Sequence, residues 1–212
     1  MVRALASGAR RALLGGAAAT AILPFVGCKG EPGKPSFRNT DVTGAAFGQD
    51  FALVDHTGRP RRLADFAGKV VVVFFGFTQC PDVCPTTLAE MAEVRRALGA
   101  DGERVQVIFV TLDPERDTPA LLAQYVPAFD ASFLGLRGSP EETAATARAF
   151  KVFFQKVPGR TPGSYTIDHT AGSYVFDTRG RLRLFVKHHP PGSGKTGNDA
   201  LLHDLRLLLA GA

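Results

Sequence analysis

The sequence has few cysteines, which form the disulfides of small folds, and few methionines, which bind soft metals. Its 212 residues include no tryptophan, two methionines and three cysteines. Three cysteines are too few for a disulfide-rich scaffold, and a chain of this size has no need of one. Met91 is the one methionine besides Met1, so metal capture by thioether sulfur is not supported.

An excess of positive charge is also missing once the N-terminus is set aside. The formal charge of +5 includes three arginines in residues 1–27, which hold no acidic residue. Without them the chain has 22 basic and 20 acidic residues, a net charge of +2. That balance lacks the basic signature of a nucleic-acid-binding protein. With 45% hydrophobic and 21% charged residues, we expect one main domain with a sizeable core.

The N-terminus is typical of an export signal. Arg10-Arg11 precede an apolar stretch, residues 12–23, which is too short and too rich in Gly and Ala for a membrane span of about 20 apolar residues. Val26-Gly27-Cys28 resembles a bacterial lipobox, in which the cysteine carries the lipid. We therefore predict a lipoprotein signal over residues 1–27, lipidation of Cys28, and a flexible Gly- and Pro-rich tether over residues 28–44.

These features predict an exported protein that a lipid anchor holds at the membrane in the bacterial periplasm. An uncleaved membrane anchor, with Cys28 as an ordinary small residue, is the alternative. The paired arginines leave the export route open between the Sec and the twin-arginine systems.

The remaining cysteines, Cys80 and Cys84, lie where an apolar run, residues 70–77, gives way to a helical pattern. Backbone N–H groups and the positive end of the helix dipole gather at such a junction and favour thiolate over thiol. The pair is therefore either a redox centre or two ligands for a soft metal. Redox centres of the thioredoxin type usually have two intervening residues, and this pair has three. A helical separation of about 6 Å still permits a disulfide, so spacing alone does not exclude thiol–disulfide exchange.

Buried strands and helices alternate along the rest of the chain. Asp117 or Thr118 and then Ser139 are candidate helix N-caps, since each is followed by a proline suited to the first helical turn. We expect, in order, a hairpin over residues 51–63, a strand over 69–77, a helix to 98, a strand over 105–112, helices over 119–129 and 139–151, strands over 172–177 and 181–186, and a helix over 199–209. This order predicts an α/β thioredoxin-like fold over residues 45–212, with an N-terminal hairpin and an insertion, residues 113–165, before the second ββα half.

Three segments carry a resemblance to a known family. They are FFGFTQCPDVCP (residues 74–85), DPERDTP (residues 113–119) and Asp168-His169-Thr170. Together, and in this order, they resemble the Sco/SenC family of copper-binding proteins over most of residues 45–210. The resemblance implies that Cys80, Cys84 and His169 bind one copper ion. It also implies a metallochaperone that serves the dinuclear copper site of cytochrome c oxidase subunit II or another copper protein.

The donor types agree with that expectation. Two thiolates and one imidazole suit Cu(I), and the same set with an added oxygen ligand can hold Cu(II). A structural zinc site ordinarily takes four protein ligands. Around these ligands, Asp168 can orient the His169 ring or be a turn residue, and Asp82 can tune the charge of the site or cap the helix.

Two other functions remain open. A thiol–disulfide oxidoreductase that reduces the cysteines of the oxidase subunit would need Cys80 and Cys84 but not His169. A copper or redox sensor would signal without delivering metal. Of the three, we expect the metallochaperone, which is not an enzyme, with redox chemistry as a secondary capacity.

Overall fold

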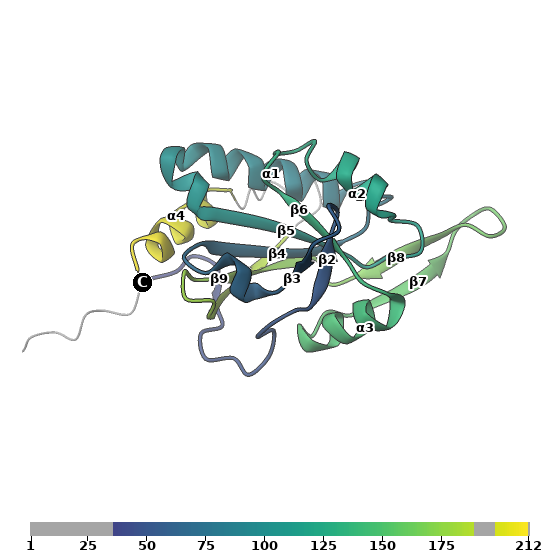
Figure 1. The fold of residues 1–212 in the computed structure, drawn as a ribbon, viewed down its shortest axis with the longest axis horizontal. Helices are drawn as coiled ribbons and strands as arrows, with labels where there is room; N and C mark the ends of the chain where they lie inside the picture. The colour runs from purple at the N-terminus through teal and green to yellow at the C-terminus, as the bar shows by residue number, and fades with distance from the viewer. Residues whose placement is uncertain (1–35, 189–197, 212) are drawn as a thin grey trace, which may run out of the picture. The chain divides into compact units, whose positions relative to one another are not determined.

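A mixed sheet organises the described part of the chain (Figure 1). The computed structural model describes residues 36–188 and 198–211. Within them eight strands pair in the order β1-β10-β9-β4-β5-β6-β2-β3, and a separate pair is formed by β7 and β8. The strands of the large sheet are β1 (Thr40–Asp41), β2 (Leu53–Asp55), β3 (Pro60–Arg61), β4 (Val70–Gly76), β5 (Val105–Thr111), β6 (Leu134–Arg137), β9 (Gly172–Phe176) and β10 (Leu182–Lys187). The separate pair is β7 (Phe154–Pro158) and β8 (Tyr165–His169).

Helices cover both faces of the sheet (Figure 1). The α-helices are α1 (Val83–Ala97), α2 (Pro119–Tyr125), α3 (Pro140–Ala149) and α4 (Asn198–Leu209). The part of the chain that the structure describes also has two short 3-10 helices, η1 (Leu63–Phe66) and η2 (Gly99–Arg104). Helices α1, α2 and α4 pack on one face, and α3 lies on the other.

Strand β4 divides the core in two because successive strand residues point to opposite faces. Val70, Val72 and Phe74 pack with the helices of the α1 face. Val71 and Val73 pack on the α3 face. Every β4 residue is buried, and β4 pairs with β5 in parallel and with β9 in antiparallel. This is the doubly covered central strand that the apolar run predicts.

The predicted α/β thioredoxin-like layout is confirmed: β4-α1-β5 forms the first half and β9-β10-α4 the second. Thr118 and Ser139 cap their helices as expected, by accepting from the N–H groups of Leu121 and Glu142. The inserted residues 113–165 contribute a strand as well as the two expected helices, since β6 joins the large sheet beside β5. Neither β6 nor β7 was expected, and α2 ends at Tyr125 rather than 129.

The chain joins the fold earlier than the sequence predicts. Backbone N–H groups of Arg38 and Asn39 donate to the Asp204 carboxylate on α4, each at 2.8 Å, and β1 pairs with β10. The boundary of the predicted tether at residue 44 is therefore wrong, because these contacts hold residues 38–41 against α4 and the sheet. The predicted signal, residues 1–27, and the lipidation site Cys28 lie outside the described residues.

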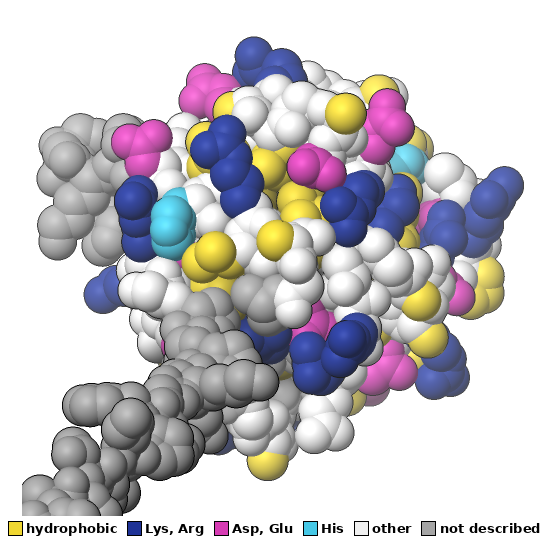
Figure 2. Space-filling model, turned by 90° about the vertical axis from the view of Figure 1, so that its left-hand side faces the viewer, with side chains coloured by type: hydrophobic (Ala, Val, Ile, Leu, Met, Phe, Trp, Pro, Cys, Tyr) yellow, Lys and Arg dark blue, Asp and Glu magenta, His cyan; other side chains and the backbone are white. Residues whose placement is uncertain are grey.

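The surface near α4 carries both signs of charge. Figure 2 shows that face, on which Lys and Arg side chains alternate with Asp and Glu side chains and with apolar patches. No single-sign field covers this view, which agrees with the near balance of charges in the sequence. No helix in residues 36–188 or 198–211 is long and apolar enough to cross a membrane.

Candidate functional site

The two cysteines lie at the carboxyl end of β4, on the loop into α1 and in its first turn. Cys80 is half-buried, whereas Cys84 is 0% exposed and packs in the core of the α1 face. Gly76 makes room for it, because a Cβ atom at Gly76 would lie 2.8 Å from the Cys84 Sγ. Cys84 is therefore closed to solvent, and Cys80 is the more accessible of the two thiols.

The two thiols share one proton and one negative charge. The pKa of Cys80 falls to about 5, chiefly because the Cys84 thiol donates a hydrogen bond to it, helped by the backbone N–H groups of Asp82 and Cys84. The pKa of Cys84 rises for the matching reason, since it keeps the donated proton and is buried. At neutral pH the pair is therefore a Cys80 thiolate held by a Cys84 thiol, and both cysteines are free of any disulfide.

His169 ends strand β8 and turns one ring nitrogen toward this pair. Its Nδ1 lies 3.0 Å from the backbone oxygen of Thr170, which can only accept, so Nδ1 carries the proton. In the neutral ring Nε2 then has a free lone pair, and it lies 3.9 Å from the Cys84 Sγ. The Phe77 ring packs edge-on against the imidazole, with centroids 6.1 Å apart. The structure thus brings Cys80, Cys84 and His169 together.

The spacing of these donors allows them to share one metal ion. Bonds of about 2.3 Å to sulfur and 2.0 Å to nitrogen, as at zinc, permit a sulfur–nitrogen separation of up to about 4.3 Å. The 3.9 Å between Cys84 Sγ and His169 Nε2 falls inside that limit. In residues 36–188 and 198–211, however, no three His, Cys, Asp or Glu side chains already surround one point as metal ligands. The two sulfurs and the imidazole nitrogen are donor types that suit a soft metal, and binding of the metal would bring them closer together.

The two acidic residues beside the ligands have smaller parts than the sequence suggests. Asp82 occupies the N-cap position of α1, but its side chain makes no capping hydrogen bond, so it acts through its backbone N–H on Cys80. Asp168 is exposed and, as a neighbour of His169 on a strand, points to the opposite face. The carbonyl of Thr170, not Asp168, orients the His169 ring.

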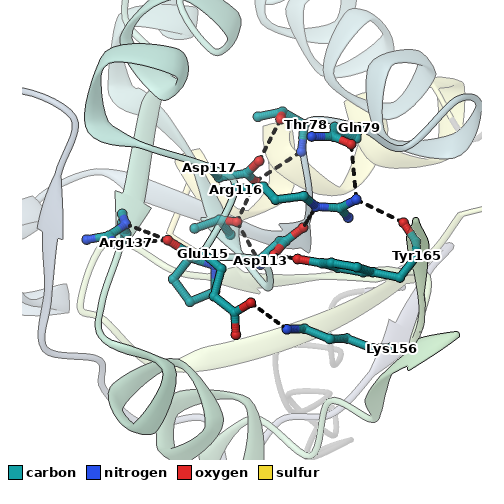
Figure 3. A network of polar contacts seen from close by, with 11 residues as sticks. Thr78, Gln79, Asp113, Glu115, Arg116, Asp117, Arg137, Lys156 and Tyr165 are labelled. Carbon is teal, nitrogen blue, oxygen red and sulfur yellow. Dashed lines mark hydrogen bonds and ion pairs between the residues drawn. The ribbon is translucent and has the colours of Figure 1, made fainter. Parts of the chain in front are cut away.

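A buried carboxylate beside the cysteine loop, residues 77–82 between β4 and α1, was not foreseen as part of the site. Asp117 is 0% exposed and accepts from the Thr78 N–H at 3.0 Å, the Thr78 hydroxyl at 2.6 Å and the Thr111 hydroxyl at 2.5 Å (Figure 3). Burial raises the pKa of Asp117. Asp117 is therefore not the N-cap of α2, which is Thr118. Its place in the loop between β5 and α2 was the one signal in the sequence.

A second unforeseen group surrounds Arg116. Its guanidinium contacts the Asp113 carboxylate and donates to the Gln79 side-chain oxygen at 3.0 Å and to the Tyr165 backbone oxygen at 2.9 Å (Figure 3). The Tyr165 hydroxyl donates to Asp113 at 2.8 Å, and Lys156 pairs with Glu115 at 2.7 Å. The loop after β5 thus ties the β7–β8 hairpin to the cysteine loop.

Fold and site together define a thioredoxin-like protein whose two cysteines at a strand–helix junction meet a histidine from a hairpin. The SCO1/SenC family model matches residues 39–197. The chain belongs to the SCO1/SenC family.

A mitochondrial relative and two solved structures are similar to this chain and support the family assignment. The mitochondrial SCO2 homolog of Bos taurus is 41% identical over 162 residues, which cover 75% of this chain and 60% of that relative. The apo Sco1 protein of Thermus thermophilus is 46% identical, with a TM-score of 0.71 over 82% of this chain and 98% of that one. The ScoI protein of Bradyrhizobium japonicum, solved with copper bound, is 41% identical, with a TM-score of 0.66 over 77% of this chain and 100% of that one.

Proposed function

We propose that this chain binds one copper ion through Cys80, Cys84 and His169. The observation that carries the proposal is the position of His169 Nε2, which lies 3.9 Å from the sulfur of Cys84, whose thiol is hydrogen-bonded to Cys80. Three donors, two of them sulfur, suit Cu(I), and an added oxygen ligand would serve Cu(II). The copper-bound relative from Bradyrhizobium japonicum supports copper as the metal.

The protein would act as a metallochaperone for the dinuclear copper site of cytochrome c oxidase subunit II. Copper would leave by ligand exchange, in which an incoming thiolate or imidazole of the partner displaces one donor at a time. Cys84 is buried, so a partner would first replace Cys80 or His169, which are partly exposed. Uptake of the metal must release the Cys84 proton, because only the thiolate is a good ligand.

We further propose that the protein works in the bacterial periplasm, tethered through a lipid on Cys28. The lipobox-like Val26-Gly27-Cys28 supports this proposal. The Cys28→Ser variant should move from the membrane fraction to the soluble periplasmic fraction. Retention of that variant in the membrane would instead favour an uncleaved anchor.

Anaerobic copper titration followed by absorption spectroscopy tests the ligand set. The purified protein should bind one copper per chain and show a thiolate-to-Cu(II) charge-transfer band. Cys80→Ala, Cys84→Ala and His169→Ala should each bind well below one copper, whereas His203→Gln on α4 is the histidine control and should match the wild type. If His169→Ala has the spectrum and copper stoichiometry of the wild type, His169 is not a copper ligand.

The contact between the thiols also favours a second function, thiol–disulfide exchange. The Cys80 thiolate would attack a disulfide of the partner, and Cys84 would then attack the mixed disulfide and lose its proton. Cys80 and Cys84 end as a disulfide, and the two electrons leave with the partner's two reduced sulfurs. This reaction has no use for His169. If His169→Ala keeps the rate at which the wild type reduces oxidised subunit II, the oxidoreductase is favoured over the chaperone.

A further inference from the structure

The hairpin that carries His169 lacks the backbone pairing that fixes the rest of the site. In the described residues, β7 and β8 pair with each other and not with the large sheet, from which they project in Figure 1. Two residues, Thr170 and Ala171, join β8 to β9 at the base of the hairpin. The distance from His169 to the thiols therefore depends on side chains that hold the hairpin in place.

Arg116 is the side chain placed to do this. One guanidinium group reaches Asp113 on its own loop, Gln79 beside Cys80, and the backbone oxygen of Tyr165 on β8. Its carbon lies 3.7 Å from the centre of the Tyr165 ring, so the planar group also stacks on that ring. Figure 3 shows the guanidinium between the cysteine loop and the hairpin.

The register of β8 transmits this contact to the imidazole. Tyr165, Ile167 and His169 alternate with exposed residues, so they share the inner face of the hairpin. Ile167 is buried in the core between the other two and keeps that face against the domain. Tyr165, which Arg116 contacts, and His169 are therefore the two ends of one strand face, and we expect a displaced Tyr165 to tilt the strand at His169.

Arg116 bridges three separate segments of the chain. Its Nε and Nη1 atoms make these contacts, and its Nη2 atom is buried with no protein hydrogen-bond partner among the described residues. The guanidinium keeps this arrangement while it joins three segments at once. Such a pattern is typical of a residue placed to orient a functional site.

We infer that Arg116 is a positioning residue that holds the His169 hairpin against the cysteine loop, so that imidazole and thiolates meet at one metal ion. The inference rests on the proposed copper function. A lysine cannot replace Arg116, because an ammonium group lacks the planar fork that reaches Gln79 and Tyr165 together.

Copper affinity, measured by competition with a chelator, tests the inference on the full chain. Removal of a group that orients a metal ligand typically costs 10- to 100-fold in affinity, and we expect about a 10-fold loss in Arg116→Lys, with a weakened charge-transfer band. Arg104→Lys is the matched control. Arg104 pairs with Asp101 at the same i,i+3 spacing but in solvent, and this variant should lose less than about twofold.

A double-mutant cycle separates positioning from general damage. If Arg116 acts through His169, then Arg116→Lys should cost less than about twofold in a His169→Ala background. An equal loss in both backgrounds, or wild-type affinity in Arg116→Lys, would overturn the inference. Failure of the wild type to bind copper would instead overturn the proposed function.

A milder variant guards against a folding defect. Gln79 is exposed, so Gln79→Ala removes the link from Arg116 to the cysteine loop without opening the core. We expect this variant to lose about threefold in copper affinity and to keep the unfolding midpoint of the wild type. Wild-type affinity in Gln79→Ala would contradict a link through the cysteine loop.

Discussion

The two halves of the candidate site are built in different ways. The cysteine half belongs to the core: Cys84 is 0% exposed, and β4 before it is buried along its whole length between β5 and β9. The histidine half is a two-stranded hairpin whose β7 strand is largely exposed, and Phe153 beside it is 56% exposed. Hydrophobic burial fixes the first half, and a few polar and stacking contacts fix the second.

This difference makes the cysteine half of the site the more rigid one and the histidine half the more mobile one. Regions with few buried apolar contacts open at a lower free energy than the core strands do. The thiols should therefore keep one arrangement, while the imidazole can approach or withdraw with its hairpin. Variants on each side should accordingly fail in different ways, by loss of stability on the cysteine side and by loss of affinity on the histidine side.

The largest effect is expected from Gly76→Ala on the cysteine side. The added Cβ would lie 2.8 Å from both the Cys84 Sγ and a ring carbon of Phe109. Overpacking of this kind costs about 3 kcal/mol of unfolding free energy and should displace Cys84 from the metal. Urea denaturation and copper titration measure the two losses.

Gly58→Ala is the control for that variant. Gly58 has φ of +87° in the β2–β3 turn, far from the cysteines in the chain, and nothing lies within 4 Å of an added Cβ. Strain at positive φ should cost about 1–2 kcal/mol there and leave copper binding intact. Intact copper binding in Gly76→Ala would show that the cysteine half is less rigid than its burial indicates.

An intermediate effect is expected on the reactivity of Cys80. Because the hydrogen bond from Cys84 lowers the pKa of Cys80 to about 5, alkylation of the apo protein should rise through pH 5 and level off by pH 7. In Cys84→Ala the midpoint should move up toward the ordinary value of 9.0. A folded pKa below the ordinary value also stabilises the folded state, fully above pH 9, and this contribution is lost as the pH falls toward 5. An unchanged midpoint in Cys84→Ala would refute the shared proton.

The smallest effect is expected from Lys156→Ala on the hairpin. The ion pair of Lys156 with Glu115 is exposed, with side chains 48% and 56% accessible. Exposed pairs contribute about 0–1 kcal/mol, so both the unfolding free energy and the copper affinity should change little. A loss of affinity as large as that of Arg116→Lys would mean that many exposed contacts, rather than Arg116, hold the hairpin.

The sequence predicts the features that short segments encode. The uniform burial of β4, the caps at Thr118 and Ser139, and the junction that activates Cys80 all follow from neighbouring residues. Strand β6 was missed because four residues with a glycine give no periodic pattern, and β7 because its residues are mostly exposed.

The supporting contacts of the site were out of reach for a different reason. Asp117 bonds to Thr78, 39 residues away, and Arg116 to Tyr165, 49 residues away. Which of several acidic and basic residues in one loop turns inward depends on partners that only the folded chain supplies. The sequence therefore pointed to the candidate metal ligands and not to the residues that hold them in place.

The attachment of residues 38 and 39 to α4 has a mechanical consequence. A pull on the chain before Arg38 would be borne first by the Asp204 carboxylate, which is 0% exposed, and then by the pairing of β1 with β10. Neither lies in the cysteine loop or the hairpin. Tension from a tether would thus act on α4 and on the edge of the sheet, and it would not displace the sulfur and nitrogen atoms of the proposed copper site.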